Sequence, residues 1–166
     1  MTERIVLPER EMHWAITRLA HEILERNRGA ENLAVVGIRT RGAHLAARLV
    51  GEIGKIAGGE PPLGIVDITL YRDDLQAIGP QPEIRGTDIP FDVEEKTIVL
   101  VDDVLYTGRT VRAAIDVIIE FGRPRAIRLA VLVERRGHRE LPVSPDFVGE
   151  TLDTTEEEQV VVHVSE

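Results

Sequence analysis

The most constraining feature of the sequence is an apolar run that ends in two aspartates and a threonine–glycine turn. Thr97 to Val101 is almost wholly apolar and is bounded by polar residues, which predicts a buried strand. Asp102 and Asp103 follow it directly. The segment T-G-R-T, from Thr107 to Thr110, then opens an apolar-periodic stretch that predicts a helix over about 110–121. A buried strand that passes through a short turn into a helix is typical of parallel α/β folds.

The rest of the chain repeats this alternation of strands and helices. We expect further helices over 9–28 and about 44–56, and further strands over 33–38, 63–70, 126–133 and 160–164. The polar stretch over 71–92 predicts a long loop of the kind that is usually functional or mobile. Such an alternation predicts a mostly parallel sheet covered by helices on both faces, and 166 residues suit one domain.

The composition excludes several classes of protein. The chain has no cysteine, which excludes disulfides, cysteine nucleophiles and cysteine metal sites. It contains no apolar run near 20 residues and no apolar leader with a cleavage site, so we expect no membrane span, no signal peptide and a cytoplasmic location. A net charge of −9 is unfavourable for general binding to polyanions, although basic residues can still gather on one face.

The segment after the Thr97–Val101 strand has the chemistry of a phosphate site. Ligands of open parallel sheets bind beyond the carboxyl ends of the strands. A helix that starts near Thr110 would present free backbone N–H groups to an anion, and Gly108 would let the backbone approach it closely. Two adjacent carboxylates suit ribose hydroxyls or a hydrated magnesium ion. The other common phosphate motifs, G-x-x-x-x-G-K-[ST] and G-x-G-x-x-G, are missing from the sequence. Taken alone, T-G-x-T fits an ordinary helix start equally well.

Two further segments have weaker signals of their own. Thr40-Arg41-Gly42 follows the first strand and predicts a turn at the same edge of the sheet. Arg41 could pair there with a pyrophosphate oxygen, and Gly42 would free the backbone. Tyr71-Arg72-Asp73-Asp74 begins the long polar loop. On their residues alone, an ordinary solvated turn is the favoured interpretation of both segments.

The whole string from Ile98 to Thr110 resembles the phosphoribosyl pyrophosphate (PRPP) signature of type I phosphoribosyltransferases. The resemblance implies their fold, which is a mostly parallel central sheet flanked by helices, with a small hood. It implies that the 40–42 turn is the pyrophosphate loop, commonly with a cis non-proline peptide, and that Arg72 on a flexible loop also contacts pyrophosphate. The implied PRPP-binding residues are Thr40, Arg41, Gly42, Arg72, Asp102, Asp103, Val104, Leu105, Tyr106, Thr107, Gly108, Arg109 and Thr110.

A closer resemblance rests on several strings together. L-V-D-D-V-L-Y-T-G-R-T, D-I-T-L-Y-R-D-D-L, R-G-H-R-E-L-P and the first helix resemble the PyrR family of bacterial pyrimidine-operon attenuation regulators. The resemblance implies a uracil phosphoribosyltransferase that converts uracil and PRPP to UMP and pyrophosphate with Mg²⁺. It implies that the base is held by a hood over about 134–166, in which Arg136 and Val160 are the matching positions. It also implies a homodimer or a higher homo-oligomer.

The same resemblance implies RNA binding. A stem-loop in the leader of pyrimidine-biosynthesis messenger RNA would bind, more tightly with UMP or UTP. The matching positions are Thr17, His21, Arg26, His138 and Arg139. On spacing alone, Thr17 and His21 lie one helical turn apart, with Arg10 and Arg28 at nearly the same azimuth. Without the resemblance, a solvated helix face is the favoured interpretation of this spacing. The chain departs from the family pattern at Ser144 and Glu150, where relatives usually carry basic residues, and by one additional arginine in the segment 134–137.

The implied chemistry assigns catalytic roles to three residues. Asp102 and Asp103 would hold the ribose hydroxyls and stabilise a cationic transition state, and Arg41 would bind the leaving pyrophosphate. Two alternatives remain open on the sequence. The chain could be an RNA-binding attenuator that senses nucleotide with negligible catalysis, or it could be a purine salvage phosphoribosyltransferase.

Overall fold

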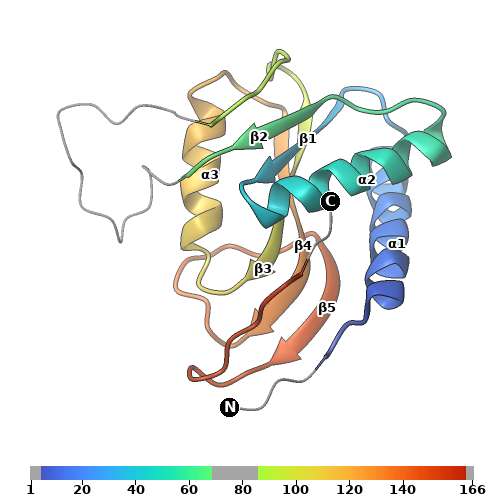
Figure 1. Ribbon diagram of the computed structural model, residues 1–166. Coiled ribbons are helices and arrows are strands. Elements are labelled where there is room, and N and C mark those ends of the chain that lie inside the picture. Colours follow the sequence, from blue (N-terminus) through green and yellow to red (C-terminus); the bar gives the residue numbers. More distant parts are fainter. Residues whose placement is uncertain (1–4, 69–85, 164–166) are drawn as a thin grey trace.

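A five-stranded parallel sheet forms the centre of the computed structural model, which describes residues 5–68 and 86–163 (Figure 1). The strands are β1 Leu33–Ile38, β2 Leu63–Val66, β3 Thr97–Leu105, β4 Ala126–Arg136 and β5 Phe147–Asp153. They lie in the order β2-β1-β3-β4-β5, and every neighbouring pair is parallel. The helices are α1 Glu9–Asn27, α2 Arg41–Ala57 and α3 Arg109–Ile119. The parallel sheet flanked by helices that the sequence predicts is therefore confirmed.

Helices cover both faces of the sheet, with α1 and α2 on one face and α3 on the other (Figure 1). Alternate residues of β1 point to opposite faces, as the pleat of a strand requires. Leu33 and Val35 pack with α1 and α2, whereas Ala34 and Val36 pack on the side of α3. All of β1 is buried, which explains why its sequence is an uninterrupted apolar run. No helix within the described residues has the length and apolar character of a bilayer-spanning segment.

A glycine in β1 lets α2 lie directly on the sheet. A Cβ atom at Gly37 would lie 2.6 Å from the backbone oxygen of Gly42 and 2.7 Å from the Cβ of Ala46, both in α2. Real Cβ atoms do not approach other atoms this closely, so no larger residue fits without moving the helix. The close approach fixes the start of α2 above the end of β1.

Four element boundaries differ clearly from the sequence prediction. Strand β2 ends at Val66, so Asp67 and Ile68 of the expected 63–70 strand form no strand, and residues 69 and 70 lie outside the described part of the chain. Helix α2 begins at Arg41 and not near residue 44, so Arg41 and Gly42 belong to its first turn. Strand β3 continues through the two aspartates to Leu105, and β4 continues to Arg136 and not to residue 133. Periodicity underestimates the lengths of α2, β3 and β4 because polar residues occupy their ends. Strand pairing nevertheless continues through these polar residues, as far as Leu105 with Glu134 and Arg136 with Asp153.

The last strand is also misplaced by the sequence prediction. Strand β5 at Phe147–Asp153 was not expected, and residues 160–163 of the expected 160–164 strand form no strand. Most of β5 is only partly buried and mixes polar with apolar residues, so it carries no clear strand pattern. Val162 instead packs as an irregular segment into the core beneath α1 and α2. In the polar loop, Asp88 forms an antiparallel bridge to Ile65, and residues 71–85 lie outside the described part of the chain.

The packing at Gly37 predicts the effect of adding one methyl group. Gly37→Ala is expected to lower the free energy of unfolding by about 1–3 kcal/mol, the usual cost of overpacking a core. Gly51→Ala is the matched control, since nothing lies within 4 Å of a Cβ at this position in α2. It is expected to raise the free energy of unfolding by up to about 1 kcal/mol through helix propensity. Urea unfolding measures both, and equal shifts in the two variants would contradict the packing argument.

Candidate active site

The carboxyl ends of β1 and β3 form the topological switch point of the sheet. From β1 the chain passes through α2 to β2 on one side, whereas β3 lies on the other side of β1. Ligands of open parallel sheets bind in the crevice at such a point, because the connecting segments diverge there. The 40–42 segment follows β1, and the segment from Asp102 to Thr110 ends β3 and begins α3. The structure thus places the two predicted motifs beside each other.

Direct packing at Gly42 joins the two motifs. A Cβ atom at this buried residue would lie 2.6 Å from the backbone oxygen of Val101 and 3.4 Å from Oδ1 of Asp102. The first turn of α2 therefore rests on the end of β3, with Thr40 and Arg41 exposed beside it. The Arg39–Thr40 peptide bond is cis, at the position where the resemblance places a cis non-proline peptide.

The two aspartates occupy different environments. Asp102 is buried, and its Oδ1 accepts a hydrogen bond of 2.8 Å from the backbone N–H of Asp103. Asp103 is half-buried, and its Oδ1 accepts a bond of 2.8 Å from the N–H of Val104. Burial raises the pKa of Asp102 well above its usual value, and the charge of Asp103 raises this pKa further. The carboxyl group of Asp102 is thus buried, whereas that of Asp103 is partly exposed.

The turn between β3 and α3 has the geometry of an anion site. Gly108 has a φ of 96°, which favours glycine, and it caps the start of α3. The Oγ1 of Thr107 accepts a hydrogen bond of 3.3 Å from the N–H of Arg109. Free N–H groups and the helix dipole favour a phosphate at this position. The structure therefore supplies the features that the T-G-R-T sequence predicts, while Val104 and Leu105 before the turn belong to β3.

The segment that follows β4 packs against this turn and forms hydrogen bonds with it. The backbone oxygen of Thr107 accepts hydrogen bonds from the N–H groups of Glu140 (2.9 Å) and Leu141 (3.3 Å). A Cβ atom at Gly108 would lie 3.3 Å from the Cβ of Val143. Arg109 reaches outward, and its Nε lies 2.8 Å from Oε1 of Glu140. The turn from Thr107 to Thr110, called the phosphate turn below, and the 139–143 segment consequently form one packed unit.

Arg139 connects this unit to the end of β4. Its guanidinium donates hydrogen bonds to the backbone oxygens of Tyr106 and Val143, each at 2.8 Å, and to the carboxylate of Glu134. Its side chain is only 21% exposed. Arg139, a predicted RNA-binding residue, thus links the backbone at the turn between β3 and α3 to that of the 139–143 segment.

Arg135 is a residue of the site that the sequence analysis missed. It is buried, and its guanidinium lies 4.0 Å from the ring centroid of Tyr106. It donates hydrogen bonds to Oγ1 of Thr154 (2.9 Å) and to the backbone oxygens of Thr155 (3.0 Å) and Glu158 (2.8 Å). The only available signal was the extra arginine in the segment 134–137, because an arginine in a polar segment otherwise predicts a solvated side chain.

The expected base-binding positions lie in other surroundings. Arg136 is exposed, with its Nη1 3.6 Å from Oδ1 of Asp153. Val160 is half-buried and packs against the core beneath α1 and α2. Arg72 lies outside the described residues.

The expected RNA-binding residues fall into three places. Thr17 and His21 lie on the outer face of α1, where Oγ1 of Thr17 donates to the backbone oxygen of His13. Arg26 lies roughly 140° around the helix axis from His21, and its Nη1 is 3.1 Å from Oδ1 of Asp146. His138 joins Arg139 near the phosphate turn, with its ring centroid 4.9 Å from that of Tyr106 and its Nε2 2.7 Å from the backbone oxygen of Thr154.

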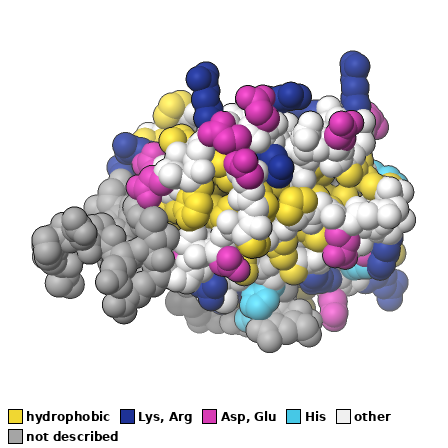
Figure 2. Space-filling model, turned by 90° about the horizontal axis from the view of Figure 1, so that it is seen from above, with side chains coloured by type: hydrophobic (Ala, Val, Ile, Leu, Met, Phe, Trp, Pro, Cys, Tyr) yellow, Lys and Arg dark blue, Asp and Glu magenta, His cyan; other side chains and the backbone are white. Residues whose placement is uncertain are grey.

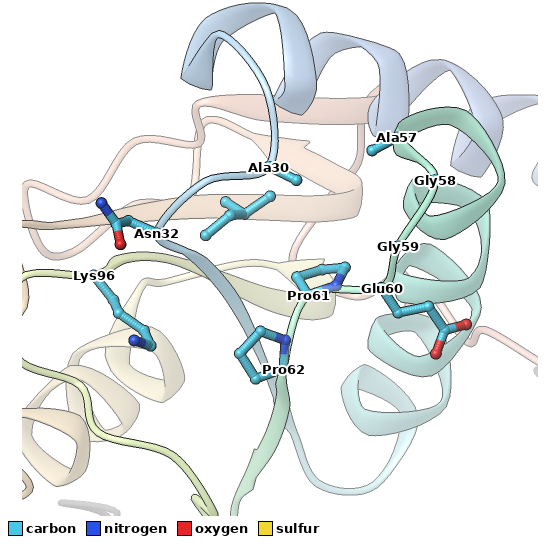
Figure 3. A pocket seen from close by; sticks show the side chains of 10 residues that line it. Ala30, Asn32, Ala57, Gly58, Gly59, Glu60, Pro61, Pro62 and Lys96 are labelled. Atoms are coloured by element: carbon cyan, nitrogen blue, oxygen red, sulfur yellow. The ribbon is translucent and has the colours of Figure 1, made fainter.

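A pocket of about 420 Å³ lies at the opposite edge of the sheet (Figure 3). Its walls come from the amino ends of β1 and β2, the end of α2 and Lys96. Because ligands of such sheets bind at the carboxyl edge, the candidate active site is the carboxyl end of β1 and β3 and not this pocket.

Seen from above in Figure 2, the molecule shows acidic and basic side chains interspersed among hydrophobic ones.

The described residues contain no cluster of three or more His, Asp or Glu side chains that could hold a metal ion. Asp102 and Asp103 supply two carboxyl groups at the crevice. Magnesium typically binds through one or two carboxylates together with phosphate oxygens of a substrate. The donor set therefore fits a magnesium ion that arrives with a phosphorylated substrate, and not one held by protein groups alone.

Comparisons with known sequences agree with this geometry. The family model described as "Phosphoribosyl transferase domain" matches residues 5–166. The chain is 55% identical to "Bifunctional protein PyrR" of Deinococcus radiodurans, covering 97% of this chain and 87% of that protein. It is 59% identical to the protein of the same description from Thermus aquaticus, with coverages of 94% and 86%.

Solved structures with the same fold include two purine enzymes. A hypoxanthine phosphoribosyltransferase from Staphylococcus aureus aligns with a TM-score of 0.71 and 17% identity, over 92% of this chain and 80% of that chain. The hypoxanthine phosphoribosyl transferase of Trypanosoma cruzi aligns with a TM-score of 0.74 and 19% identity, over 92% and 79%. At these identities the likeness establishes the fold alone.

The buried Asp102 predicts a pH-dependent gain of stability on neutralisation. Because its pKa is raised in the folded protein, its contribution to stability is fully present below the ordinary aspartate pKa of about 4 and is lost as the pH rises through the raised value. Asp102→Asn keeps the acceptor for the N–H of Asp103 but never carries charge. It is expected to raise the Tm at pH 7, by an amount that shrinks towards pH 4.

Thermal unfolding in metal-free buffer between pH 4 and pH 8 measures this difference. Asp116→Asn, which changes an exposed aspartate of α3, is the matched control and is expected to show little dependence on pH. A lower Tm for Asp102→Asn at pH 7 would contradict the assignment of a buried, destabilising charge.

Proposed function

Because this chain belongs to the phosphoribosyl transferase family and, within it, to the PyrR proteins, we propose that it is a uracil phosphoribosyltransferase that also regulates pyrimidine biosynthesis. As an enzyme, it converts uracil and PRPP to UMP and pyrophosphate. As a regulator, it binds the leader of pyrimidine-biosynthesis messenger RNA, more tightly when UMP or UTP is bound. We also propose a cytoplasmic location and a homodimer or higher homo-oligomer.

The packing of Gly42 against Val101 and Asp102 is the observation that carries the enzymatic proposal. It brings together three sites that match the three parts of PRPP. The turn from Thr107 to Thr110 suits the 5-phosphate, the aspartate pair suits the ribose hydroxyls, and Thr40 with Arg41 suits the pyrophosphate.

In the proposed reaction, the bond between the anomeric carbon and pyrophosphate breaks with oxocarbenium character. The anomeric carbon bonds to a ring nitrogen of uracil, and that nitrogen loses its proton. The carboxylates of Asp102 and Asp103 stabilise the developing positive charge electrostatically. The 5-phosphate is remote from the bond that breaks, so the binding energy of the phosphate turn orients the substrate. Arg41 pairs with the leaving pyrophosphate, and Arg72 is proposed to do the same.

We propose Mg²⁺ as the cofactor, held by Asp102 or Asp103 together with oxygens of PRPP. When bound, the ion neutralises charge on the pyrophosphate as this group departs. We propose that Arg136 and Val160 contact the base from a hood over about 134–166. The contact of Arg135 with Tyr106 supports this location, because it links the hood directly to the phosphate turn.

For RNA binding we propose Thr17, His21, Arg26, His138 and Arg139. The contacts of His138 and Arg139 with Tyr106 support a dependence on nucleotide, because a ligand on the phosphate turn would change the surroundings of both side chains. Ser144 and Glu150 provide no positive charge, so the affinity for phosphates rests on the other basic residues.

Two alternatives have different signatures. A purine salvage enzyme shares the fold, but the identities of 17% and 19% to purine enzymes lie far below the 52–59% to PyrR proteins. A nucleotide sensor without catalysis would use the same crevice, and an assay of UMP formation separates it from an enzyme.

Catalysis predicts a loss of activity on removal of either active-site carboxylate. In steady-state assays of UMP formation from uracil and PRPP with Mg²⁺, Asp102→Asn and Asp103→Asn are each expected to lower kcat by roughly 10²–10³-fold, as for the loss of an electrostatic stabiliser. Asp116→Asn is the exposed control and is expected to keep the wild-type rate. Unchanged rates in the first two variants would contradict the catalytic assignment, and a wild-type chain that acts only on hypoxanthine or guanine would favour the purine alternative.

Regulation predicts nucleotide-dependent RNA binding through α1. Filter binding to a hairpin from a pyrimidine-operon leader is expected to tighten when UMP is added. His21→Ala is expected to weaken binding by about 5-fold, the equivalent of one hydrogen bond of about 1 kcal/mol. His163→Ala removes an exposed imidazole elsewhere and serves as the control. An affinity that ignores both UMP and the change at His21 would exclude this surface.

A further inference from the structure

Trp14 is a large aromatic side chain on the solvent face of α1. Its exposed fraction is 58%, although tryptophan commonly buries most of its surface. The guanidinium of Arg10, one turn earlier, lies 6.0 Å from its ring centroid. Tryptophan with a neighbouring cation is a common element of binding surfaces, since it offers a rigid π-face.

The surroundings of Trp14 are basic and polar. With about 100° per residue, Arg10, His13, Trp14, Thr17 and His21 form one strip on α1, directed away from the sheet. Arg10, His13, Trp14 and His21 are exposed, and Thr17 is half-buried. This strip contains no carboxylate, even though the chain as a whole has a net charge of −9.

Helix α1 carries four glutamates, of which Glu25 borders the strip one turn after His21, while Glu9, Glu11 and Glu22 lie further to the side. Glu11 and Glu22 are on the flank that turns towards β5, where Arg18 pairs with Glu22 at 3.1 Å. Arg18 also donates to the backbone oxygens of Val148 (3.2 Å) and Gly149 (2.7 Å) in β5. Glu25 lies eleven residues after Trp14, or roughly 16 Å along the helix axis, so the end of the strip at Arg10 and Trp14 is its more basic end.

The contacts along α1 also fix which end of the strip is near the active site. Arg26 lies beside Asp146 before β5, and Arg18 lies beside Val148 and Gly149 near its start. Helix α1 thus runs antiparallel to β5, so Trp14 and Arg10 lie towards the carboxyl ends of the strands. The phosphate turn with Tyr106 is at this same end of the sheet.

We propose that Trp14 is a stacking platform for an unpaired base of the bound RNA, with Arg10 beside it to contact the base or the adjacent phosphate. This inference rests on the proposed regulatory function and adds a residue and a mode of contact to it. Bases in RNA loops are accessible and stack on aromatic side chains. Stacking of this kind accepts any base, because every base has a π-face. The strip supplies the positive charge that the phosphates need.

A second copy of the chain is the competing occupant. The cores of homodimer interfaces are enriched in apolar surface and depleted in charge. Around Trp14 the strip instead presents Arg10, two histidines and Thr17. These neighbours favour a polyanion over a second copy of the same acidic chain.

The fluorescence of Trp14 tests the proposal directly, because it is the only tryptophan in the chain. The probe is a synthetic leader hairpin with an unpaired loop, and a fully paired duplex of the same length is its control. Titration of the wild-type chain with the hairpin is expected to quench the emission, and the duplex is expected to quench it much less.

Substitutions separate stacking from a merely structural role. In filter binding, Trp14→Ala is expected to weaken hairpin affinity by about 5- to 100-fold, as for the loss of one base stacked on an aromatic ring. Trp14→Phe retains a ring and is expected to recover most of the affinity. Thermal unfolding of both variants verifies that they fold, which is expected for an exposed position.

The outcomes distinguish this inference from the regulatory proposal itself. Tight hairpin binding without quenching, and with no effect of Trp14→Ala, would overturn the stacking role and leave RNA binding intact. A wild-type chain that binds no leader hairpin would overturn both. A third outcome would assign Trp14 to an interface between copies of the chain. In that case, sedimentation shows that Trp14→Ala converts an oligomer into monomers, and the quenching of the wild-type emission depends on protein concentration and not on RNA.

Discussion

The close approach of α2 to the ends of β1 and β3 is the constraint on which the rest of the site depends. Gly37 and Gly42 have no side chain, so backbone packs directly on backbone at both positions. The backbone oxygens of Gly42 and Val101 lie too close to leave room for a Cβ atom at Gly37 and at Gly42, respectively. The sheet order places β1 and β3 side by side, but these two glycines bring the start of α2 against Asp102. The proposed binding of PRPP depends on this closeness, because its pyrophosphate and ribose groups are joined by one bond.

A second set of contacts makes the phosphate turn part of a larger unit. Tyr106 lies against Arg135 and His138, and its backbone oxygen accepts a hydrogen bond from Arg139. Arg135 in turn binds the segment 154–158 through three oxygen atoms. A buried arginine is costly unless its donors are satisfied, and here backbone and hydroxyl oxygens satisfy them. The turn that anchors a phosphate is consequently coupled to residues far along the chain.

The sequence predicts the parts of this structure that depend on local pattern. The apolar run of β1 predicts its bounds correctly, because a strand buried on both faces must be apolar throughout. The acidic pair and T-G-R-T predict the strand end, the tight turn and the helix start at the proposed site, because all three are encoded within neighbouring residues. The early start of α2 was missed because it depends on Gly42 packing against Val101, which is distant in sequence.

Edge strands and buried charges are harder to predict for the same reason. Strand β5 has a neighbour in β4 and an exposed flank, so its residues need not alternate clearly. Arg135 carries the same charge as the exposed Arg136, and only the fold determines which of the two lies against Tyr106. Neither fact is visible in composition or periodicity, because each depends on partners from another part of the chain.

The buried Asp102 illustrates a conflict between stability and function within one residue. Its carboxyl group is removed from water and lies beside Asp103, and both conditions oppose its ionisation. A stable core would place a neutral residue there, yet positive charge that develops on a bound ribose requires a nearby carboxylate. Such local violations of folding rules are expected where a site must meet the charge of a transition state. Pairing of β3 with β1 on one side and β4 on the other holds this unfavourable group in place at the proposed site.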